Sequence, residues 1–420
     1  MASTVAQPPA SQPAGPGRAS RGFGALGFVI VTAFIDSMGI GLVVPVLPTL
    51  LQELTGGGVA DAALWGGFAT FIYAIMQFVF SPFIGGLSDR FGRRPVLLTS
   101  LSAFAVDMLI LAAATSLWMF ILARTLAGVF AATLATANAY VADITPPAER
   151  GRRFAFLGAA FGAGFVFGPA IGGALGDVSP RAPFYLAAAM AIGNVVYGYF
   201  AAPESLTPER RRAFSWRRAN PFGTLVTLGR LPGLRRLLAV YFLMVLSTWV
   251  YVTVWSYVAI AKFDWSEGEI GFSVAYYGVI SVLSQALVVQ YVLPRIGAPR
   301  AIWIALVVEA VALAGIAFAE TGLVLYAMIS LALISTMQDP AIRQELSSGA
   351  PDDAQGELQG GLSALSGIAI ILSPLIYNSL FNRFAGPDAA VHFPGAPFIV
   401  ASVIAVLAAL LYGLGRRRAE

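Results

Sequence analysis

The sequence predicts an all-α integral membrane protein with twelve transmembrane helices in two six-helix halves. Three observations lead to this fold class: an apolar composition, a set of apolar segments of bilayer-crossing length, and an internal repeat. Hydrophobic residues make up 58% of the 420 residues and charged residues only 11%, which lies outside the range of soluble domains.

Twelve apolar segments are long enough to cross a bilayer. Backbone polar groups inside lipid must be satisfied within their own segment, so each crossing requires a helix of about 20 mainly apolar residues. The helices are expected at 24–51, 63–87, 95–115, 117–142, 152–175, 182–202, 237–260, 268–293, 299–318, 322–340, 356–382 and 396–415.

Three polar segments complete the predicted organisation. Residues 1–22 are rich in Pro, Ala and Ser and lack an apolar core followed by a cleavage site, so a disordered tail without a signal peptide is expected. A basic, Pro-containing linker at 203–236 separates an N-terminal half, 23–202, from a C-terminal half, 237–415. A short tail at 416–420 follows the last helix.

An internal repeat supports the division into halves. Shifting the sequence by 205 positions superposes six punctuation residues on identical residues, among them Pro169 on Pro374. The triplet APF recurs at 182–184 and 396–398, an offset of 214, which requires a nine-residue insertion in the last loop. The halves are therefore expected to be related by a pseudo-twofold axis, with the substrate between them near the midplane. A duplicated receptor or scaffold is the alternative.

Positive charges set the expected orientation, because they are retained on the cytoplasmic side of a membrane. With twelve crossings both termini lie on one side, and the loops of that side hold 22 of the 26 Lys and Arg residues. The opposite loops hold Arg181, Lys262 and Arg383, and Arg124 lies within a helix. Both termini are therefore expected in the cytoplasm, with the chain in a bacterial inner membrane. The basic runs flank membrane spans, so no nucleic-acid partner is expected.

Several kinds of chemistry lack the residues that they require. The chain has no Cys, and its single His, His392, lies in a predicted loop, so neither a metal site nor a His-dependent catalytic triad is expected. A membrane-embedded enzyme would require clustered His, Cys or carboxylates near one surface, and the sequence offers no such cluster. We expect a transporter without enzyme activity or cofactor.

The stretch GGLSDRFGRRP, residues 85–95, places four charges within six residues between two apolar segments. Gly92 permits a tight reversal, and Pro95 suits the first turn of the next helix. An acid beside arginines at the membrane surface can form or break an ion pair at modest cost, which suits a latch. The alternative is that the arginines only set the orientation. The predicted latch residues are Gly85, Asp89, Arg90, Gly92, Arg93 and Arg94.

Ionisable residues inside apolar spans are costly and are functional candidates by default. Asp36, Asp107 and Arg124 are expected within about two helical turns of one another in depth, and Glu309 lies mid-helix in the C-terminal half. Burial favours the protonated carboxyl and an adjacent Arg favours the ionised one, so opening and closing a cavity can load and unload a proton. The alternatives are a permanent salt bridge for the first three and an outward-facing or packing role for Glu309.

The helix at 152–175 carries a glycine face. Gly164, Gly168 and Gly172 recur every four residues, which lets another helix approach closely. Pro169 adds a bend, and Gly173 extends the small-residue face. On composition alone this is a packing helix.

The motifs together resemble a known transporter family. The loop G-x-L-x-D-R-x-G-R-R-P is similar to the signature loop of the major facilitator superfamily. That resemblance implies a latch in which Asp89 engages the N-terminus of the helix at 356–382 in the outward-open state, with the arginines facing Asp143. The degenerate copy PRIGAPR, 294–300, lacks the Asp and should latch weakly.

A closer resemblance is to drug/proton antiporters, and within them to the tetracycline/proton antiporter group. It rests on G-x-x-x-G-P-x-x-G-G, which spans Gly164 to Gly173, and on DSMGIGLVVPVLPTLL, YAIMQF, AYVADI, SPRAPF, PES and GELQGGLSAL. The resemblance implies proton-coupled export of an amphipathic drug-like compound, with tetracycline as one candidate. The group's helix-eight His falls at Ser281 and its helix-nine Asp at Glu309, so proton coupling must rest on carboxylates. Uptake by a related symporter is the alternative.

The substrate cavity is expected between the halves, lined by polar and aromatic side chains. Aromatic walls with few polar anchors suit amphipathic ligands of several shapes, although such aromatics also occur at the lipid interface. The expected partners are this small substrate, protons and lipid, and the protein is expected to be a monomer. The candidates are Gln77, Asn138, Phe165, Trp249, Trp255, Tyr276, Tyr277, Gln285 and Gln338.

Overall fold

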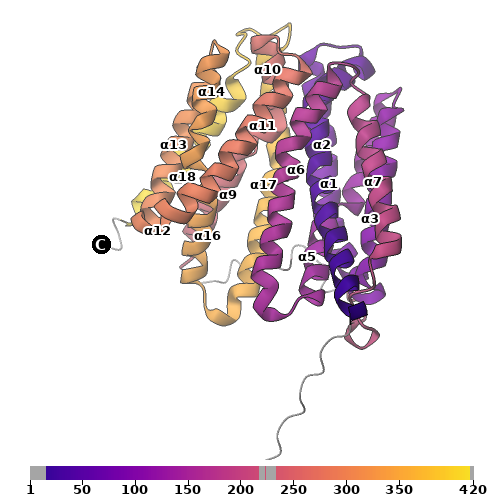
Figure 1. Cartoon of the computed structure of the whole chain (residues 1–420). Coiled ribbons are helices and arrows are strands. Elements are labelled where there is room, and N and C mark those ends of the chain that lie inside the picture. Colours follow the sequence, from indigo (N-terminus) through magenta and orange to yellow (C-terminus); the bar gives the residue numbers. More distant parts are fainter. Residues whose placement is uncertain (1–15, 217–222, 224–232, 417–420) are drawn as a thin grey trace, which may run out of the picture.

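The computed structural model describes residues 16–216, 223 and 233–416, and these fold as an all-helical bundle (Figure 1). The helices form twelve spans that are long and apolar enough to cross a membrane, which confirms the number predicted. The N-terminal half contains α1 (Pro16–Thr55), α2 (Val59–Phe91), α3 (Arg93–Ala112), α4 (Leu117–Phe130), α5 (Thr133–Ile144), α6 (Arg150–Gly176) and α7 (Ala182–Ala201).

The C-terminal half is divided into more segments. It contains α9 (Arg235–Thr248), α10 (Val250–Phe263), α11 (Glu267–Leu283), the π-helical η3 (Ser284–Val292), α12 (Leu293–Ile296), α13 (Ala298–Phe318), α14 (Gly322–Ser330), α15 (Ala332–Ser335), α16 (Gln338–Gly349), α17 (Gln355–Ala385) and α18 (Ala396–Arg416).

The helix starts reproduce the internal repeat. α3 and α13, α4 and α14, α5 and α16, and α6 and α17 each begin 205 positions apart. α7 and α18 begin 214 positions apart, which is the offset of the repeated APF. The offset read from the sequence therefore corresponds to two copies of one helical arrangement.

Several membrane spans are interrupted where the sequence predicts one continuous helix. The fourth span breaks between α4 and α5 and the tenth between α14 and α16. α5 and α16 begin at Thr133 and Gln338, again 205 positions apart, so the two breaks occupy equivalent places in the repeat. Breaks at matching positions of two transporter halves are typical of segments that line a binding site.

Two predicted boundaries are wrong. Residues 1–22 are predicted to be disordered; 1–15 lie outside the described residues, but α1 already begins at Pro16. The tenth span is predicted to end at 340, which would put Asp339 at the membrane surface. Instead α16 continues to Gly349, so Asp339 stands in the first turn of that helix. The polar run QDPAIRQELSSG masks this extension, because hydropathy falls while the helix continues.

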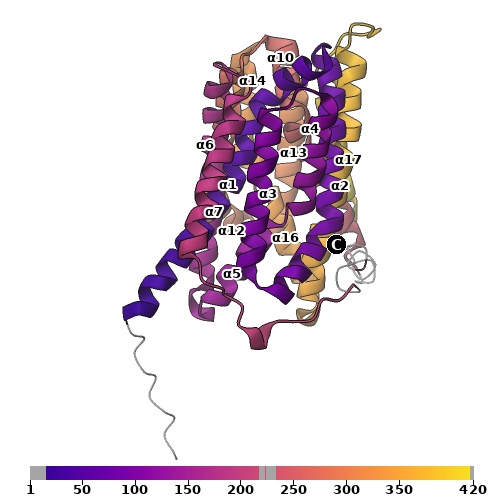
Figure 2. The same ribbon diagram turned by 90° about the vertical axis from the view of Figure 1, so that its right-hand side faces the viewer.

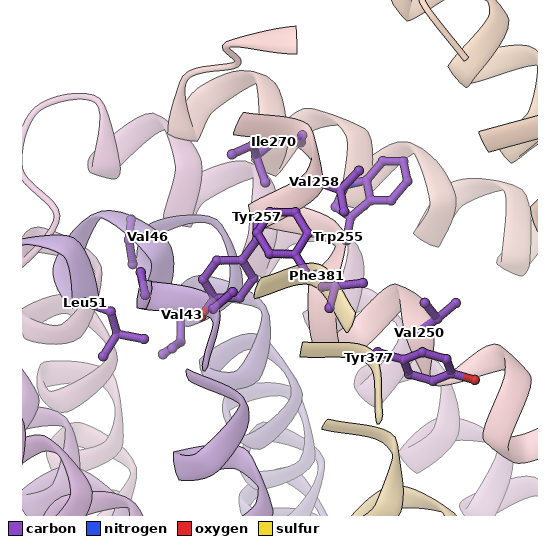
Figure 3. Packing of buried hydrophobic residues seen from close by; sticks show 14 of the residues in the cluster. Val43, Val46, Leu51, Val250, Trp255, Tyr257, Val258, Ile270, Tyr377 and Phe381 are labelled. Atoms are coloured by element: carbon purple, nitrogen blue, oxygen red, sulfur yellow. The ribbon is translucent and has the colours of Figure 1, made fainter. Parts of the chain in front are cut away.

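The two halves meet along one end of the bundle. We call the end where α1 begins and α18 ends the terminal end, and the opposite end the distal end (Figures 1 and 2). One core cluster contains only residues of the C-terminal half and another only residues of the N-terminal half. The largest cluster joins both, with Val43, Val46 and Leu51 of α1 near Tyr257 of α10 and Phe381 of α17 (Figure 3).

Between described residues, the hydrogen bonds that join the halves lie at the distal end. Ser256 donates to the Val44 carbonyl over 2.8 Å, and Asn378 donates to the Ala63 carbonyl over 2.8 Å. Asn382 reaches the Ala60 carbonyl at 3.0 Å. No hydrogen bond or ion pair joins the two halves at the terminal end in residues 16–216 and 233–416. The structure is therefore the state that is closed at the distal end.

Candidate functional site

A buried ion pair lies inside the N-terminal half. Asp107 of α3, which is 2% exposed, pairs with Arg124 of α4. The Arg124 guanidinium also stands 6.0 Å from the centre of the Tyr73 ring on α2, a cation–π arrangement. The predicted proximity of Asp107 and Arg124 is confirmed. The Asp107 Oδ1 and the Arg124 Nε atoms have no hydrogen-bond partner, so the pair retains capacity for further polar contacts.

Asp36 stands apart from this pair. It is partly buried on α1 and forms no hydrogen bond or ion pair with any residue that the structure describes. Tyr73 lies within electrostatic range of Asp36 as well as of Asp107 and Arg124. Asp36, the ion pair and the Tyr73 ring therefore interact with one another, and Asp36 is the member without a partner among the described residues.

Glu309 is the buried acid of the C-terminal half. It is 3% exposed on α13, and one of its carboxylate oxygens has no hydrogen-bond partner. The Ser335 side chain, at the end of α15, lies within hydrogen-bonding reach of it. The stacked rings of Tyr251 and Tyr277, 5.7 Å apart, are also close enough to interact with it electrostatically. Glu309 thus touches the broken tenth span, and its burial excludes the outward-facing alternative.

The glycine face of α6 packs against α1. A Cβ atom at Gly164, Gly168 or Gly172 would lie within 2.6 Å of a carbonyl oxygen of α1. Gly173 instead faces the other half, where a Cβ would lie 2.3 Å from the Glu267 carbonyl of α11. The predicted close approach of a second helix is confirmed. The glycine motif of α6 contacts α1 within its own half and α11 of the other half. Pro169 shares this surface, since it lies against Gly41.

Gly172→Ala should lower the thermal stability of the purified protein and its folded yield. The added methyl group would meet the Leu42 carbonyl at 2.5 Å, and overpacking of this kind costs about 1–3 kcal/mol. Gly162→Ala on the same helix is the matched control, because a Cβ there meets no atom within 4 Å. Equal melting temperatures for the two variants would contradict this packing role.

The predicted latch loop forms a compact network at the terminal end. Gly92 adopts φ 112°, which favours glycine, and begins the turn between α2 and α3. Arg93 pairs with Asp89 over 2.6 Å and with Asp143 over 3.2 Å. The expected contact between the arginines and Asp143 is therefore present. Arg90 is exposed and lies over the neighbouring Phe91 ring.

The start of the linker binds to this loop, which the sequence did not indicate. Glu204 accepts hydrogen bonds from the backbone N–H groups of Arg93 at 2.8 Å and of Arg94 at 3.3 Å, and so caps α3. Further along, the Arg212 N–H donates to the Asp89 carbonyl over 3.1 Å. A cavity of about 200 Å³ lies beside this contact, lined by Gly85, Phe214 and their neighbours.

Asp89 does not reach the helix that the resemblance implies. Its carboxylate pairs with Arg93 and forms no hydrogen bond or ion pair with residues 353–356 of the described chain. The implied contact belongs to the outward-open state, whereas this structure is closed at the distal end. The implied contact of Asp89 with that helix therefore stays a prediction.

Two of the predicted cavity residues lie at the repeat-related breaks. The Gln77 amide donates to the Ala131 carbonyl over 3.1 Å, which satisfies a carbonyl freed by the break after α4. Gln338 is the first residue of α16 and is 4% exposed. Its amide nitrogen reaches the Thr248 hydroxyl at 3.4 Å, while its Oε1 has no partner. These two amides are the polar groups best placed as anchors.

Trp255 is buried in the core of this state, and its role in the cavity stays a prediction. It is 6% exposed, and its indole N–H donates to the Ser273 hydroxyl over 2.9 Å within the same half (Figure 3). That partner allows the whole ring to be buried. The other candidates retain some exposure and stay predictions; they are Asn138, Phe165, Trp249, Tyr276, Tyr277 and Gln285.

Sequence reasoning missed several residues that join elements. Tyr73 lies within the quoted segment YAIMQF, yet a single aromatic residue in a span normally indicates packing. Asn378 and Asn382 form inter-half hydrogen bonds, and Asp177 accepts one from α11. The only available signal was their polarity within or next to apolar spans.

Comparisons with known proteins agree with this architecture. A family model described as the Major Facilitator Superfamily matches residues 29–374. The class C tetracycline resistance protein of Escherichia coli is 38% identical, with 86% of this chain and 90% of the relative covered. The class G tetracycline resistance protein of Vibrio anguillarum is 36% identical, with 84% and 89% covered. Multidrug resistance protein 2 of Bacillus subtilis is 28% identical, with 92% and 93% covered.

Solved structures show the same fold at low sequence identity. The human organic anion transporter MFSD10 has a TM-score of 0.69 at 23% identity, with 93% of this chain and 99% of that chain covered. A D-xylose-proton symporter has a TM-score of 0.73 at 17% identity, with 93% and 97% covered. The repeat-related halves, the latch loop and the tetracycline resistance relatives together place this chain in the major facilitator superfamily, to which it therefore belongs.

Proposed function

We propose that the protein exports an amphipathic, drug-like compound in exchange for protons. The observation that carries the proposal is Asp36, a carboxylate in the middle of a membrane span that has no partner among the described residues and interacts, like the Asp107–Arg124 pair, with Tyr73. Relatives that are tetracycline resistance proteins over most of the chain support export of a drug. Uptake by a symporter is not favoured, because α6 carries the complete antiporter motif.

The terminal end lies in the cytoplasm in this proposal. Of the 26 Lys and Arg residues, 22 belong to loops and tails on that side of the bilayer, as the positive-inside rule requires. The bilayer is a bacterial inner membrane, in line with the bacterial relatives. Closure at the distal end then makes this the inward-facing state, in which substrate enters from the cytoplasm.

The chain's own residues suit proton exchange. An unpaired carboxylate in a span is costly when ionised, so Asp36 binds a proton while its cavity excludes water and loses it once the cavity is hydrated. Asp107 has Arg124 as a counter-charge and Asp36 has none among the described residues, so the two acids respond differently to the same change of access. Exchange of proton for substrate at this cluster requires no cofactor and no catalysis. One polypeptide chain contains both halves, so a monomer suffices for transport.

The substrate site in this proposal lies between the halves at the two helix breaks. Gln77 and Gln338 supply hydrogen bonds, and Tyr276 and Tyr277 supply aromatic surface, which suits a planar amphipathic ligand. Tetracycline is the first compound to test because of the named relatives. Ser281 in place of a His leaves proton coupling to the carboxylates.

Inverted membrane vesicles test this function directly. With an imposed proton gradient, vesicles that contain the protein should concentrate tetracycline, and added tetracycline should release protons from them. Vesicles without the protein are the control for passive entry. Uptake of substrate into whole cells, with no accumulation in inverted vesicles, would overturn the direction of transport.

A further inference from the structure

The first turn of α11 is held by two groups of the opposite half at the distal end. The Gly268 N–H donates to the Asp177 Oδ1 over 2.9 Å, and Thr49 of α1 donates to the Glu267 carboxylate. Asp177 immediately follows α6, and Glu267 is the first residue of α11. An acid of one half therefore caps a helix of the other half.

The placement of Asp177 is unfavourable within its own half. It lies at the C-terminal end of α6, where the helix dipole repels an anion. The N-terminus of α11 offers unpaired N–H groups and partial positive charge. Asp177 therefore has this hydrogen bond and this favourable helix end only while the distal ends of α6 and α11 stay together.

The backbones of these helices are close enough for the contact to depend on closure. A Cβ at Gly271 would lie 2.2 Å from the Pro169 carbonyl, and one at Gly268 would lie 2.2 Å from the Asp177 Oδ2. A movement that opens the distal end separates these surfaces and breaks the hydrogen bond. At the terminal end, Asp89 pairs with Arg93 of its own half, so it does not oppose this closure.

We propose that Asp177 is a positioning residue that latches the distal end shut and so biases transport toward the state open at the terminal end. The proposal rests on alternating access in the function proposed above. Loss of one anion at an exposed helix N-terminus removes about 0.3–1 kcal/mol. Asp177→Asn should thus lower the ratio of distal-closed to distal-open molecules by about two- to five-fold.

Spin-label distances measure this ratio without substrate or proton gradient, so their outcome is separate from that of the transport assay. The chain has no Cys, which allows introduced pairs to be labelled cleanly. Trp118→Cys with Leu323→Cys reports on the distal end, where the two residues are 75% and 83% exposed at the starts of α4 and α14. Ala148→Cys with Ser348→Cys reports on the terminal end; both residues are exposed.

Asp177→Asn should increase the fraction of molecules in which the spin labels of the distal pair are far apart. It should also increase the fraction in which the labels of the terminal pair are close together. Asp177→Lys should shift both further in the same direction. Glu269→Gln is the matched control, because Glu269 sits in the same helical turn but bonds only to Ser266 of its own half. That variant should leave both distributions as in the parent protein.

Two outcomes would overturn the proposal. Unchanged distances in both Asp177 variants, with the proteins folded, would show that the contact does not bias the equilibrium. An equal shift for Glu269→Gln would show that charge at the helix end matters, and not the contact across the halves. A role in folding alone would lower the melting temperature of the Asp177 variants without changing the ratio of the two states.

Discussion

Asp36→Asn is expected to abolish concentrative export while leaving the folded yield and the melting temperature unchanged. Asn cannot bind or release a proton in the physiological range, so a variant that lacks the carrier cannot use the gradient. The structure gives Asp36 no ion pair and no hydrogen bond with a described residue, so its loss strands no partner. The measurement is tetracycline accumulation in inverted vesicles, normalised to folded protein.

A counterflow assay distinguishes a defect in proton coupling from a defect in substrate movement. Exchange of labelled for unlabelled substrate at equal concentrations needs alternating access but no net proton movement, so Asp36→Asn should retain it. Asp388→Asn, at an exposed loop position, is the control for the same chemical change. Concentrative export that persists in the Asp36 variant would assign the proton to another residue.

Much of the fold could be predicted from the sequence, because it depends on properties of single residues such as hydropathy and helix-bending. Span number follows from hydropathy, and the repeat offset follows from punctuation residues such as Pro169 and Pro374, whose effects on a helix are local. The breaks do not follow, because Ala131 and Ala132 carry no Pro or Gly signal and the fourth span reads as continuous. The break before α16 has a weak signal in Pro340, because proline suits the first turn of a helix.

The charged residues of the candidate site could be predicted, because a charge inside an apolar span is costly. The contacts between helices that are distant in sequence could not. A charge inside an apolar span needs a reason, so Asp107, Arg124 and Glu309 are visible in the sequence. Tyr73 and Ser335 lie beside these acids only because helices distant in sequence pack together. The sequence leaves open whether Glu309 faces outward, and only the packing of α13 against α15 shows its burial.

The Asp107–Arg124 pair differs from Asp36, because replacing either residue leaves the other without its counter-charge. Removing one partner of a buried ion pair costs about 3–5 kcal/mol. A transport defect in Asp107→Asn alone therefore cannot distinguish a coupling residue from a structural one. The double variant Asp107→Asn/Arg124→Gln removes both charges and restores neutrality.

We expect Asp107→Asn to lower the melting temperature and folded yield strongly, and the double variant to recover most of that loss, since two neutral amides can hydrogen bond where the ion pair stood. Concentrative export should stay absent in the double variant. The double variant has no acid at position 107 and no arginine at position 124 on the broken fourth span. Proton binding at this pair can therefore no longer be coupled to movement of that span. The paired measurements are thermal unfolding and gradient-driven tetracycline accumulation for both single variants and the double variant. If the double variant regains accumulation together with stability, the pair only holds α3 to α4, and proton coupling in the N-terminal half rests on Asp36 alone.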